Sequence, residues 1–471
     1  MERVEAEAIY AAGREAVVEV LLAMDRRIRE LEARVERLER QLGRNSRNSS
    51  LPPSEDPPGV SPRRRGKDRS GRPQGGQSGH EGHGRELLPA WAVDERVDHW
   101  PARCGCGHVF VDGERVAARE PARHQVEELP QIAVRVTEHR CQRVRCPDCG
   151  VEQTAELPPE VAGCAFGPRF QAAVATLSVR NRVSRRDLVE CCEELFGARI
   201  AAGTVEAILT RTANALEQPY EQLLGRVRRS RALNVDETGW RLKGDRRTLW
   251  GAFTDKIAVF KVAEDRHEQR LRELLADHQG IVTSDRWWAY DHLPLHRRQI
   301  CWSHLQRDFQ AHAEGLDAER EFGQAGLRVC GRVFWAWEVY QHTHDRRQLQ
   351  LEVRALRREL KPILSRYRGK APRYKRSRGM ARNLLKAWPA LWTFADQPGV
   401  QPTNNHAERA LRGAVIYRKL SLGSQSRHGE QRIERLLSAS ITCRLQHRSL
   451  FAYLAELLAA HTRNQPLPTL A

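Results

Sequence analysis

The N-terminal pattern of apolar and charged positions predicts a coiled coil over residues 1–43. Apolar side chains recur at alternating steps of four and three residues, and from Asp25 onward most other positions are Arg or Glu. A seam of this period winds helices into a left-handed coiled coil, so we expect self-association here. An amphipathic helix that packs on its own domain is the alternative. The seam consists of Val17, Leu21, Met24, Ile28, Leu31, Val35, Leu38 and Leu42.

Residues 44–90 carry no periodic apolar pattern. From Arg44 to Arg85 the chain has eight Gly, six Pro and nine basic residues against four acidic ones. Such a composition buries no core, so we predict a flexible basic linker. The linker either follows DNA phosphates or serves only as a spacer.

Apolar periodicity over residues 161–228 predicts helices in series. We expect Ser184 to cap one helix that ends at Gly197, and Thr204 to cap the next. Two helices joined by a short Gly-containing turn suit a helix-turn-helix whose second helix enters the DNA major groove. Arg211 is the one obvious phosphate or base contact on that second helix, so a simple helical bundle is an equal alternative.

Short β-rich segments predict an α/β core. An apolar-leaning run is typical of a buried strand from whose end Asp236 emerges, and two further strands are joined by a hairpin turn at Thr254. A short helix then leads into a strand that ends in Asp285. Three antiparallel strands, a crossover helix and another strand give an RNase H-like layout. The expected strands are 232–235, 246–253, 257–262 and 281–285, with the helix at 268–275.

The long gap before the next core segment indicates a helical insertion at residues 311–400. Within it, residues 361–386 hold ten Lys and Arg and no acid. We interpret this stretch as a phosphate-binding surface, with a disordered basic loop as the alternative. The candidate DNA contacts are Arg373, Lys375, Arg376 and Arg378, together with Arg412 further along the chain.

Composition indicates a class of binding partner. Lys and Arg number 78 against 60 Asp and Glu, a formal net charge of +18, and only nine of the 78 are Lys. Arg pairs bidentately with phosphate, so the excess favours a polyanionic partner, although an Arg-rich genome would give the same totals. The chain shows no membrane-length apolar run and no signal-peptide pattern, which predicts a cytoplasmic protein without a membrane partner.

Four of the eleven Cys form two close pairs, which predict a structural Zn²⁺ site in a small β domain at residues 91–160. A segment with strand-like alternation, 131–136, separates the pairs. Two thiolate pairs on two turns, joined through a hairpin, make a tetrahedral site. Cys141 or His108 is an alternative ligand, and unrelated buried thiols are the other interpretation. The expected ligands are Cys104, Cys106, Cys146 and Cys149.

Three acids in different parts of the chain indicate a second metal site. Asp236 and Asp285 follow short strands, and Glu408 opens a helical stretch. Carboxylates held in this way bind two Mg²⁺ ions that stabilise the attacking and leaving oxygens of phosphoryl transfer. Each acid alone is as well explained by a turn or a helix N-terminus. Asp255 and Asp291 are weaker candidates, and Glu237 should point to the opposite face of its strand from Asp236.

The order of these features resembles the insertion-sequence 66 transposases, the TnpC-type DDE family, over essentially the whole chain. The resemblance implies that Asp236, Asp285 and Glu408 are the catalytic triad, holding Mg²⁺ or Mn²⁺, and that the partners are transposon-end and target DNA and accessory proteins of the same element. The one-residue gap between Cys104 and Cys106 departs from the family's usual spacing and leaves the zinc ligand set open. The most specific matches are Val235-Asp-Glu-Thr238, Ser284-Asp285, Cys301-Trp-Ser-His304 with Arg307, and Asn404-Asn-His-Ala-Glu-Arg409.

We therefore expect a multidomain α+β protein that cleaves and transfers DNA strands. An RNase H-type nuclease that cuts without joining, and a non-catalytic or decayed DNA-binding regulator, are the alternatives. His304 either positions the site or is a satisfied core histidine. The expected domains are the coiled coil 1–43, the linker 44–90, the zinc-binding domain 91–160, the helical segment 161–228, the first core part 229–310, the insertion 311–400, and the second core part with C-terminal helices 401–471.

Overall fold

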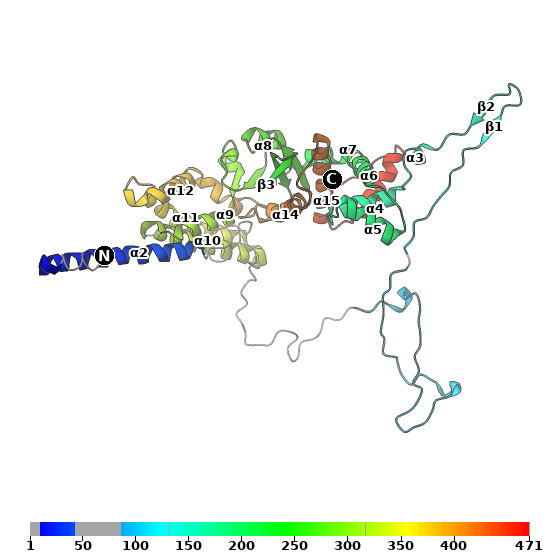
Figure 1. Ribbon diagram of the computed structural model, residues 1–471, viewed down its shortest axis with the longest axis horizontal. Helices are drawn as coiled ribbons and strands as arrows, with labels where there is room; N and C mark the ends of the chain where they lie inside the picture. The colour runs from blue at the N-terminus through cyan, green and yellow to red at the C-terminus, as the bar shows by residue number, and fades with distance from the viewer. Residues whose placement is uncertain (1–9, 43–85, 131, 316, 471) are drawn as a thin grey trace.

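The computed structural model describes residues 10–42, 86–130, 132–315 and 317–470 (Figure 1). A long helix, α2 (Arg14–Leu42), occupies the predicted heptad region. Part of its apolar seam is exposed, and pairing between chains stays a prediction. The expected linker falls mostly on residues 43–85, outside the described part. Four seam side chains are between 43% and 60% exposed, namely Leu21, Met24, Ile28 and Leu31.

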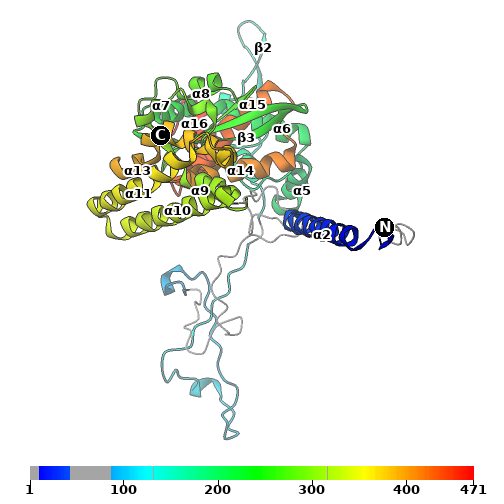
Figure 2. The same cartoon turned by 90° about the vertical axis from the view of Figure 1, so that its left-hand side faces the viewer.

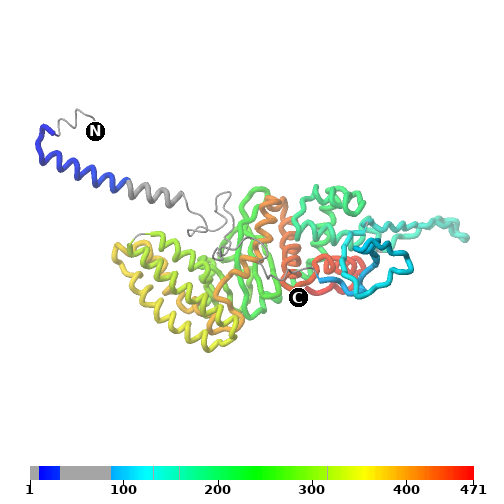
Figure 3. The backbone as a smooth tube through the Cα atoms, turned by 90° about the horizontal axis from the view of Figure 1, so that it is seen from below, coloured from blue at the N-terminus to red at the C-terminus, as the bar shows by residue number. Residues whose placement is uncertain are grey.

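A five-stranded sheet lies between the helical insertion and the helices that precede the sheet in the chain (Figures 1 and 3), and its strand order is β5-β4-β3-β6-β7. β3 (Ala232–Leu242), β4 (Asp245–Phe253) and β5 (Ala258–Ala263) are antiparallel. After helix α8 (Glu268–Leu275), β6 (Ile281–Ser284) pairs parallel with β3, and β7 (Arg298–Ile300) with β6. The predicted strand and helix order is confirmed, but β7 has no counterpart in the prediction because its three residues form no apolar run.

Strand β3 corrects the expected position of Asp236. The strand continues to Leu242, so Asp236 lies within it and not at its end. The second half of β3 carries no apolar pattern, because backbone pairing with β4 holds this part of the strand in place. A two-residue turn, Lys243-Gly244, joins the two strands, and both of its residues have positive φ. What stops before Asp236 is the parallel pairing, because β6 pairs only with residues 232–234. One edge of β3 is therefore open beside Asp236.

Helices pack against the sheet and cover its β5 edge. α14 (Asn405–Ser421) packs against β3 and β4, and α15 (Arg427–Leu445) packs against β5. Three polar side chains of α15, spaced four residues apart, accept alternate backbone N–H groups of β5 and so satisfy an edge that would otherwise be open. These bonds join Glu434 to Val262 at 2.8 Å, Ser438 to Phe260 at 2.9 Å and Thr442 to Ala258 at 3.0 Å.

The helices before the sheet share its apolar core with α15 and with α16 (Leu450–Thr462). The Ser184 hydroxyl accepts the Asp187 N–H, and Gly197 ends the helix with φ of 63°, as predicted. The Thr204 cap is wrong: the next helix begins at Ala202, without a side-chain cap, because packing of its apolar face fixes its start. The four helices are α4 (Pro168–Val179), α5 (Arg185–Phe196), α6 (Ala202–Ala215) and α7 (Glu217–Arg228).

The insertion is helical, as predicted, and its apolar side chains form a second core together with β7 and helix α9 (Trp302–Ala313). Figure 2 shows its two long helices, α10 (Asp317–Thr343) and α11 (Arg346–Tyr367), side by side. The basic stretch contains helix α12 (Lys375–Lys386), so it is not the unstructured loop of the alternative interpretation. None of the helices in the described ranges is long and apolar enough to cross a bilayer.

Candidate catalytic site

Three structural elements supply the three predicted acids. Asp236 lies in β3, Asp285 directly follows β6, and Glu408 is in the first turn of α14. Because β6 is the neighbour of β3 in the sheet, the carboxyl end of β6 opens beside the middle of β3. Asp236 and Asp285 are 49 positions apart in the chain, and Asp285 and Glu408 are 123 positions apart. The fold nevertheless brings the three acids toward the same part of the sheet.

A buried asparagine anchors the start of α14 to β3. Asn404 is fully buried, and its Nδ2 donates to the Val235 carbonyl at 2.7 Å while its Oδ1 accepts Nδ2 of Asn234 at 2.9 Å. Its backbone N–H donates to Sγ of Cys301 at 3.1 Å, just before helix α9 (Trp302–Ala313). These bonds place Glu408, one turn further along α14, against the strand that carries the first acid.

The three carboxylates form one cluster of negative charge. Burial raises the pKa of Asp236 well above its usual range, and the charges of Glu237, Asp285 and Glu408 raise this pKa further. A single hydrogen bond, from the Glu237 N–H to Asp236 Oδ1 at 3.0 Å, acts in the opposite direction. Like charges shift a pKa in this way only across short distances. The predicted acids are therefore electrostatic neighbours.

Cations contact two of the acids. Oδ2 of Asp285 lies 3.9 Å from Nη2 of Arg266, and its Oδ1 accepts the Trp287 N–H at 2.9 Å. Oε1 of Glu408 lies 3.3 Å from Nη2 of Arg307, on α9.

The same Oε1 of Glu408 lies 3.6 Å from Nδ1 of His304. Burial lowers the pKa of His304, and Arg307 lowers it further, so its imidazole is neutral at pH 7 despite the acids around it. His304 and Arg307 belong to the block around Cys301 that the sequence analysis singled out.

Glu237, which we expected on the opposite face of its strand from Asp236, belongs to the same network, since its charge acts on the pKa of Asp236. Its side chain is only 3% exposed, it accepts the Tyr290 hydroxyl at 3.0 Å, and it pairs with Arg266. Burial raises the pKa of Glu237, and Asp285 raises it further. Arg266, which also stacks over Trp287 at 4.1 Å, is a site residue that the sequence pattern misses, because it sits in a charged loop without periodicity.

The donor chemistry of the cluster suits a hard divalent cation, since carboxylate oxygens and negative charge are what Mg²⁺ prefers. The side chains do not yet converge on one coordination point: across the described ranges, no group of three or more His, Cys, Asp or Glu side chains is arranged to hold a metal ion. The acids are thus assembled as neighbours by the fold, with their oxygens not closed around an ion.

The cysteine pairs each form a tight turn in an exposed segment. Cys104 accepts the Gly107 N–H through its carbonyl at 2.9 Å, and Cys146 accepts that of Gly150 at 2.9 Å. Turn amides and the second thiol of each pair lower the pKa of Cys104 and of Cys146. The second pair joins two short strands, β1 (Arg143–Arg145) and β2 (Glu152–Thr154).

The expected strand over residues 131–136 is wrong for the part that the structure describes. Residues 132–136 are exposed and belong to no strand, since no neighbouring segment pairs with their backbone. The hairpin that does form, β1–β2, surrounds the second cysteine pair alone and projects from the body of the molecule (Figure 1). The described chain therefore does not join the two pairs, and four-cysteine zinc ligation stays a prediction.

The predicted DNA contacts differ in whether their side chains are exposed or already bonded within the protein. Lys375 is exposed on α12, whereas Arg376 lies 3.2 Å from Glu319 and Arg373 stacks over Tyr374. Arg378 is half-buried. Its guanidinium donates to the carbonyls of the loop that precedes α12, at 2.7 Å to Gly369 and 3.1 Å to Ala371. Arg412 is exposed on α14, one turn beyond Glu408.

Comparison with known proteins gives the class of this protein as a transposase. A family model described as "Transposase IS66 family" matches residues 163–432, which is more than half of the 471-residue chain. The protein belongs to the IS66 transposase family. The matched region contains all three acids and the insertion. A second model, for a family of unknown function, matches residues 3–86.

Two relatives from Sinorhizobium fredii are similar over much of the chain. "Uncharacterized protein y4hP" is 23% identical over 397 residues, which cover 76% of this chain and 70% of that protein. "Uncharacterized protein y4jD" is 24% identical over 297 residues, or 56% of each chain. Their names assign no activity, so the chemistry of this chain rests on its own residues.

Proposed function

We propose that this protein is a DDE-type DNA transposase that cleaves DNA at the ends of a bacterial insertion sequence and joins the freed strand to target DNA, with Mg²⁺ or Mn²⁺ as cofactor. The observation that carries the proposal is the placement of Asp236, Asp285 and Glu408, three acids far apart in the sequence, by the paired strands β3 and β6 and by α14, whose start Asn404 ties to β3. Membership of the IS66 family supports the same conclusion.

The three acids are the proposed ligands of two metal ions. When bound, the ions supply an activated water and stabilise the attacking and leaving oxygens of the phosphodiester. The chain's own contribution is to hold carboxylates where their mutual repulsion favours a cation. Burial raises the pKa of Asp236 and the neighbouring carboxylates raise it further, so a nearby cation would favour its ionised form.

Neighbouring side chains fix the third ligand and the substrate. Arg307 contacts Glu408 and orients its carboxylate, and the neutral imidazole of His304 leaves the local negative charge intact. Arg412, one helical turn from Glu408, is the proposed contact to a DNA phosphate. The exposed basic residues of α12, chiefly Lys375, are the proposed contacts to further DNA phosphates.

The rest of the chain supports binding and assembly in this proposal. The strand order and the position of the acids support an RNase H-like core. We propose that Cys104, Cys106, Cys146 and Cys149 hold a structural Zn²⁺ and that the exposed seam of α2 pairs with a second copy of the chain. The protein would act in the cytoplasm, where insertion-sequence DNA is available.

The test is a strand-transfer assay with full-length protein, a DNA substrate bearing the element's ends, a target plasmid and Mg²⁺. Glu408→Gln removes a metal ligand and one charge, so we expect cleavage and joining to fall by about 10³-fold or more, with DNA affinity nearly unchanged. Glu456→Gln, on the exposed face of α16, is the matched control.

The outcomes separate the competing functions. Cleavage without joined product would identify a nuclease. Wild-type protein that binds the ends without cleaving them would identify a regulator. Activity of Glu408→Gln equal to that of Glu456→Gln would overturn the assigned site.

A further inference from the structure

A basic pocket lies between the sheet and the insertion, and its lining includes Arg286, the residue after Asp285. Its volume is about 290 Å³, near the lower limit for small-ligand sites. The walls come from the loop after β6, from β7 and from the last turn of α12. Three cations line the pocket, Arg286, Arg298 and Lys386, against one carboxylate, Asp291.

Arg298 gives the pocket a buried donor that lacks an acceptor. Its side chain is 2% exposed, and Nη1 lies 3.0 Å from Asp291. Its Nε has no hydrogen-bond partner among the residues that the structure describes. Buried guanidinium donors are normally satisfied, so an unpaired one in the wall of a cavity indicates an acceptor that enters from outside the chain.

Of the other two cations, Arg286 is paired with a carboxylate and Lys386 is not, among the described residues. Nε of Arg286 lies 3.2 Å from Asp308, and its Nη1 donates to Oδ1 of Asn383 at 3.1 Å. Lys386 is exposed and makes no ion pair within the described chain. The positive charge of Lys386 is therefore free to meet an anion.

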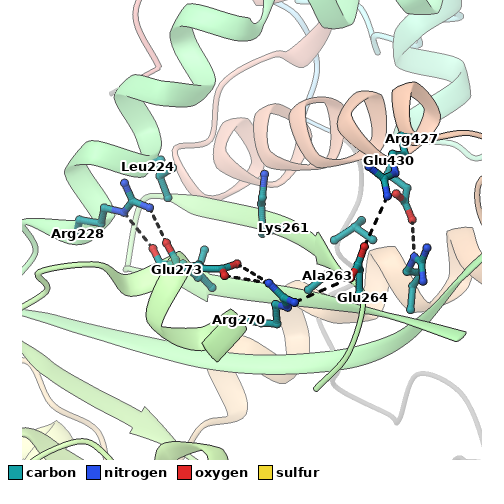
Figure 4. A pocket seen from close by; sticks show the side chains of 12 residues that line it. Leu224, Arg228, Lys261, Ala263, Glu264, Arg270, Glu273, Arg427 and Glu430 are labelled. Carbon is teal, nitrogen blue, oxygen red and sulfur yellow. Dashed lines mark hydrogen bonds and ion pairs between the residues drawn. The ribbon is translucent and has the colours of Figure 1, made fainter. Parts of the chain in front are cut away.

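The free cation Lys386 distinguishes this pocket from a second cavity, of about 370 Å³, whose cations all have partners within the described chain (Figure 4). The Nε of Arg270, in the wall of that second cavity, lacks a hydrogen-bond partner just as the Nε of Arg298 does, so an unpaired Nε alone does not make such a site. Arg228 donates to the carbonyls of Glu273 and Leu274, and Arg270 pairs with Glu273. The remaining pairs are Arg247 with Glu430, Arg427 with Glu264, and Lys261 with Glu434.

We propose that the pocket of Arg298 and Lys386 binds one phosphate group of a DNA strand. The cavity admits a phosphate with its sugar and excludes a duplex, and its donors match phosphate oxygens. Arg286, the residue that follows Asp285, also lines the pocket, so the strand would be held close to the reacting bond. This inference rests on the proposed function, because it names a strand contact of the same site.

The experiment measures binding of full-length protein to a fluorescent ten-nucleotide single strand in EDTA, by anisotropy at several salt concentrations. Lys386→Gln should weaken binding about three- to ten-fold and reduce the salt slope by about one. Arg298→Lys keeps the charge but loses the planar fork, and we expect about a ten-fold loss. Lys243→Gln, in the exposed β3–β4 turn, is the control that should leave binding unchanged.

Two forms of the DNA probe show whether the pocket binds a terminal or an internal phosphate. If the site takes a strand terminus, a 5′-phosphate strengthens binding to wild-type protein, and Lys386→Gln removes that gain. If it takes an internal phosphate, the 5′-phosphate has no effect, and one neutral methylphosphonate linkage reproduces the loss seen in Lys386→Gln.

The inference is overturned if Lys386→Gln and a folded Arg298→Lys bind every probe as Lys243→Gln does. Because the assay contains no divalent metal, its result is independent of catalysis. A wild-type protein that fails to cleave DNA while the pocket variants lose affinity would refute the proposed function alone. Normal strand transfer with no loss of affinity in either pocket variant would refute the pocket alone.

Discussion

The acid cluster and the cysteine turns are both predicted metal sites, but the fold treats them differently. The acids stand on a sheet whose packing and buried hydrogen bonds fix them without any bound ion, as Asn404 does for the start of α14. Between residues 86 and 157, none of the described residues is buried. A segment without a core lacks the interactions that would join two distant turns. Packing can therefore assemble the acid cluster before any ion binds, whereas the cysteine site needs its Zn²⁺ ion to form.

The largest expected effect is on the cysteine segment. Removing zinc with a chelator should unfold residues 91–160, since binding of a structural Zn²⁺ contributes about 10–16 kcal/mol in small metal domains, while the sheet stays folded. Hydrogen exchange followed peptide by peptide measures both regions at once. Cys149→Ser should reproduce the loss, and Cys141→Ser should not. Equal protection of residues 91–160 with and without chelator would contradict the zinc site.

The next effect tests the preassembled site. Asn404→Ala removes two buried side-chain hydrogen bonds and leaves the Val235 carbonyl unsatisfied, so we expect the free energy of unfolding to fall by about 2–4 kcal/mol. Urea denaturation followed by tryptophan fluorescence gives the value. Asn405→Ala, the adjacent and less buried position, should change it by less than about 0.5 kcal/mol. Equal losses in the two variants would show that the anchor is unimportant.

A smaller effect concerns the charge of the acid cluster. Because burial and like charges raise the pKa of Asp236, its ionised form costs stability above the folded-state pKa, and this cost declines as pH falls toward the unfolded-state value. Asp236→Asn should therefore be more stable than the wild type at pH 7 in EDTA, by about 0.5–2 kcal/mol.

The pH dependence of thermal unfolding checks the sign of this effect. The advantage of Asp236→Asn should shrink as the pH is lowered from 7 toward the usual pKa of an aspartate, because the cost of ionising the buried carboxyl is then lost. Asp245→Asn, at the exposed start of β4, should show no such trend. An advantage that grows at low pH would contradict the assigned electrostatics.

The smallest effect separates free from structural cations on the insertion. Lys375→Gln should reduce the salt slope of DNA binding by about one, since an exposed Lys releases one counterion on contact with phosphate. Arg378→Gln should leave that slope unchanged and lower thermal stability, because its guanidinium holds the loop carbonyls of Gly369 and Ala371. Equal slopes for both variants would contradict this division.

Local physics explains which predictions are confirmed. The helix Glu268–Leu275, the hairpin turn at Thr254 and the Ser184 cap each depend on neighbours within a few residues, and each appears where expected. Thr204 fails because tertiary packing starts its helix earlier. The strand β7 and the bridging role of Arg266 leave no local signature, since their partners are distant in the sequence.

The sequence by itself determined the residue types of this protein: which side chains are acids, thiols or cations, and which short segments prefer helix or strand. Only the tertiary structure decided that Glu408 joins Asp236, that Glu237 and Asp285 share Arg266, and that the Nε of Arg298 is buried without an acceptor among the described residues. The physical reason is that propensity and hydrogen-bond capacity are properties of single residues and near neighbours. Proximity across a hundred residues exists only after the apolar core has closed the chain on itself.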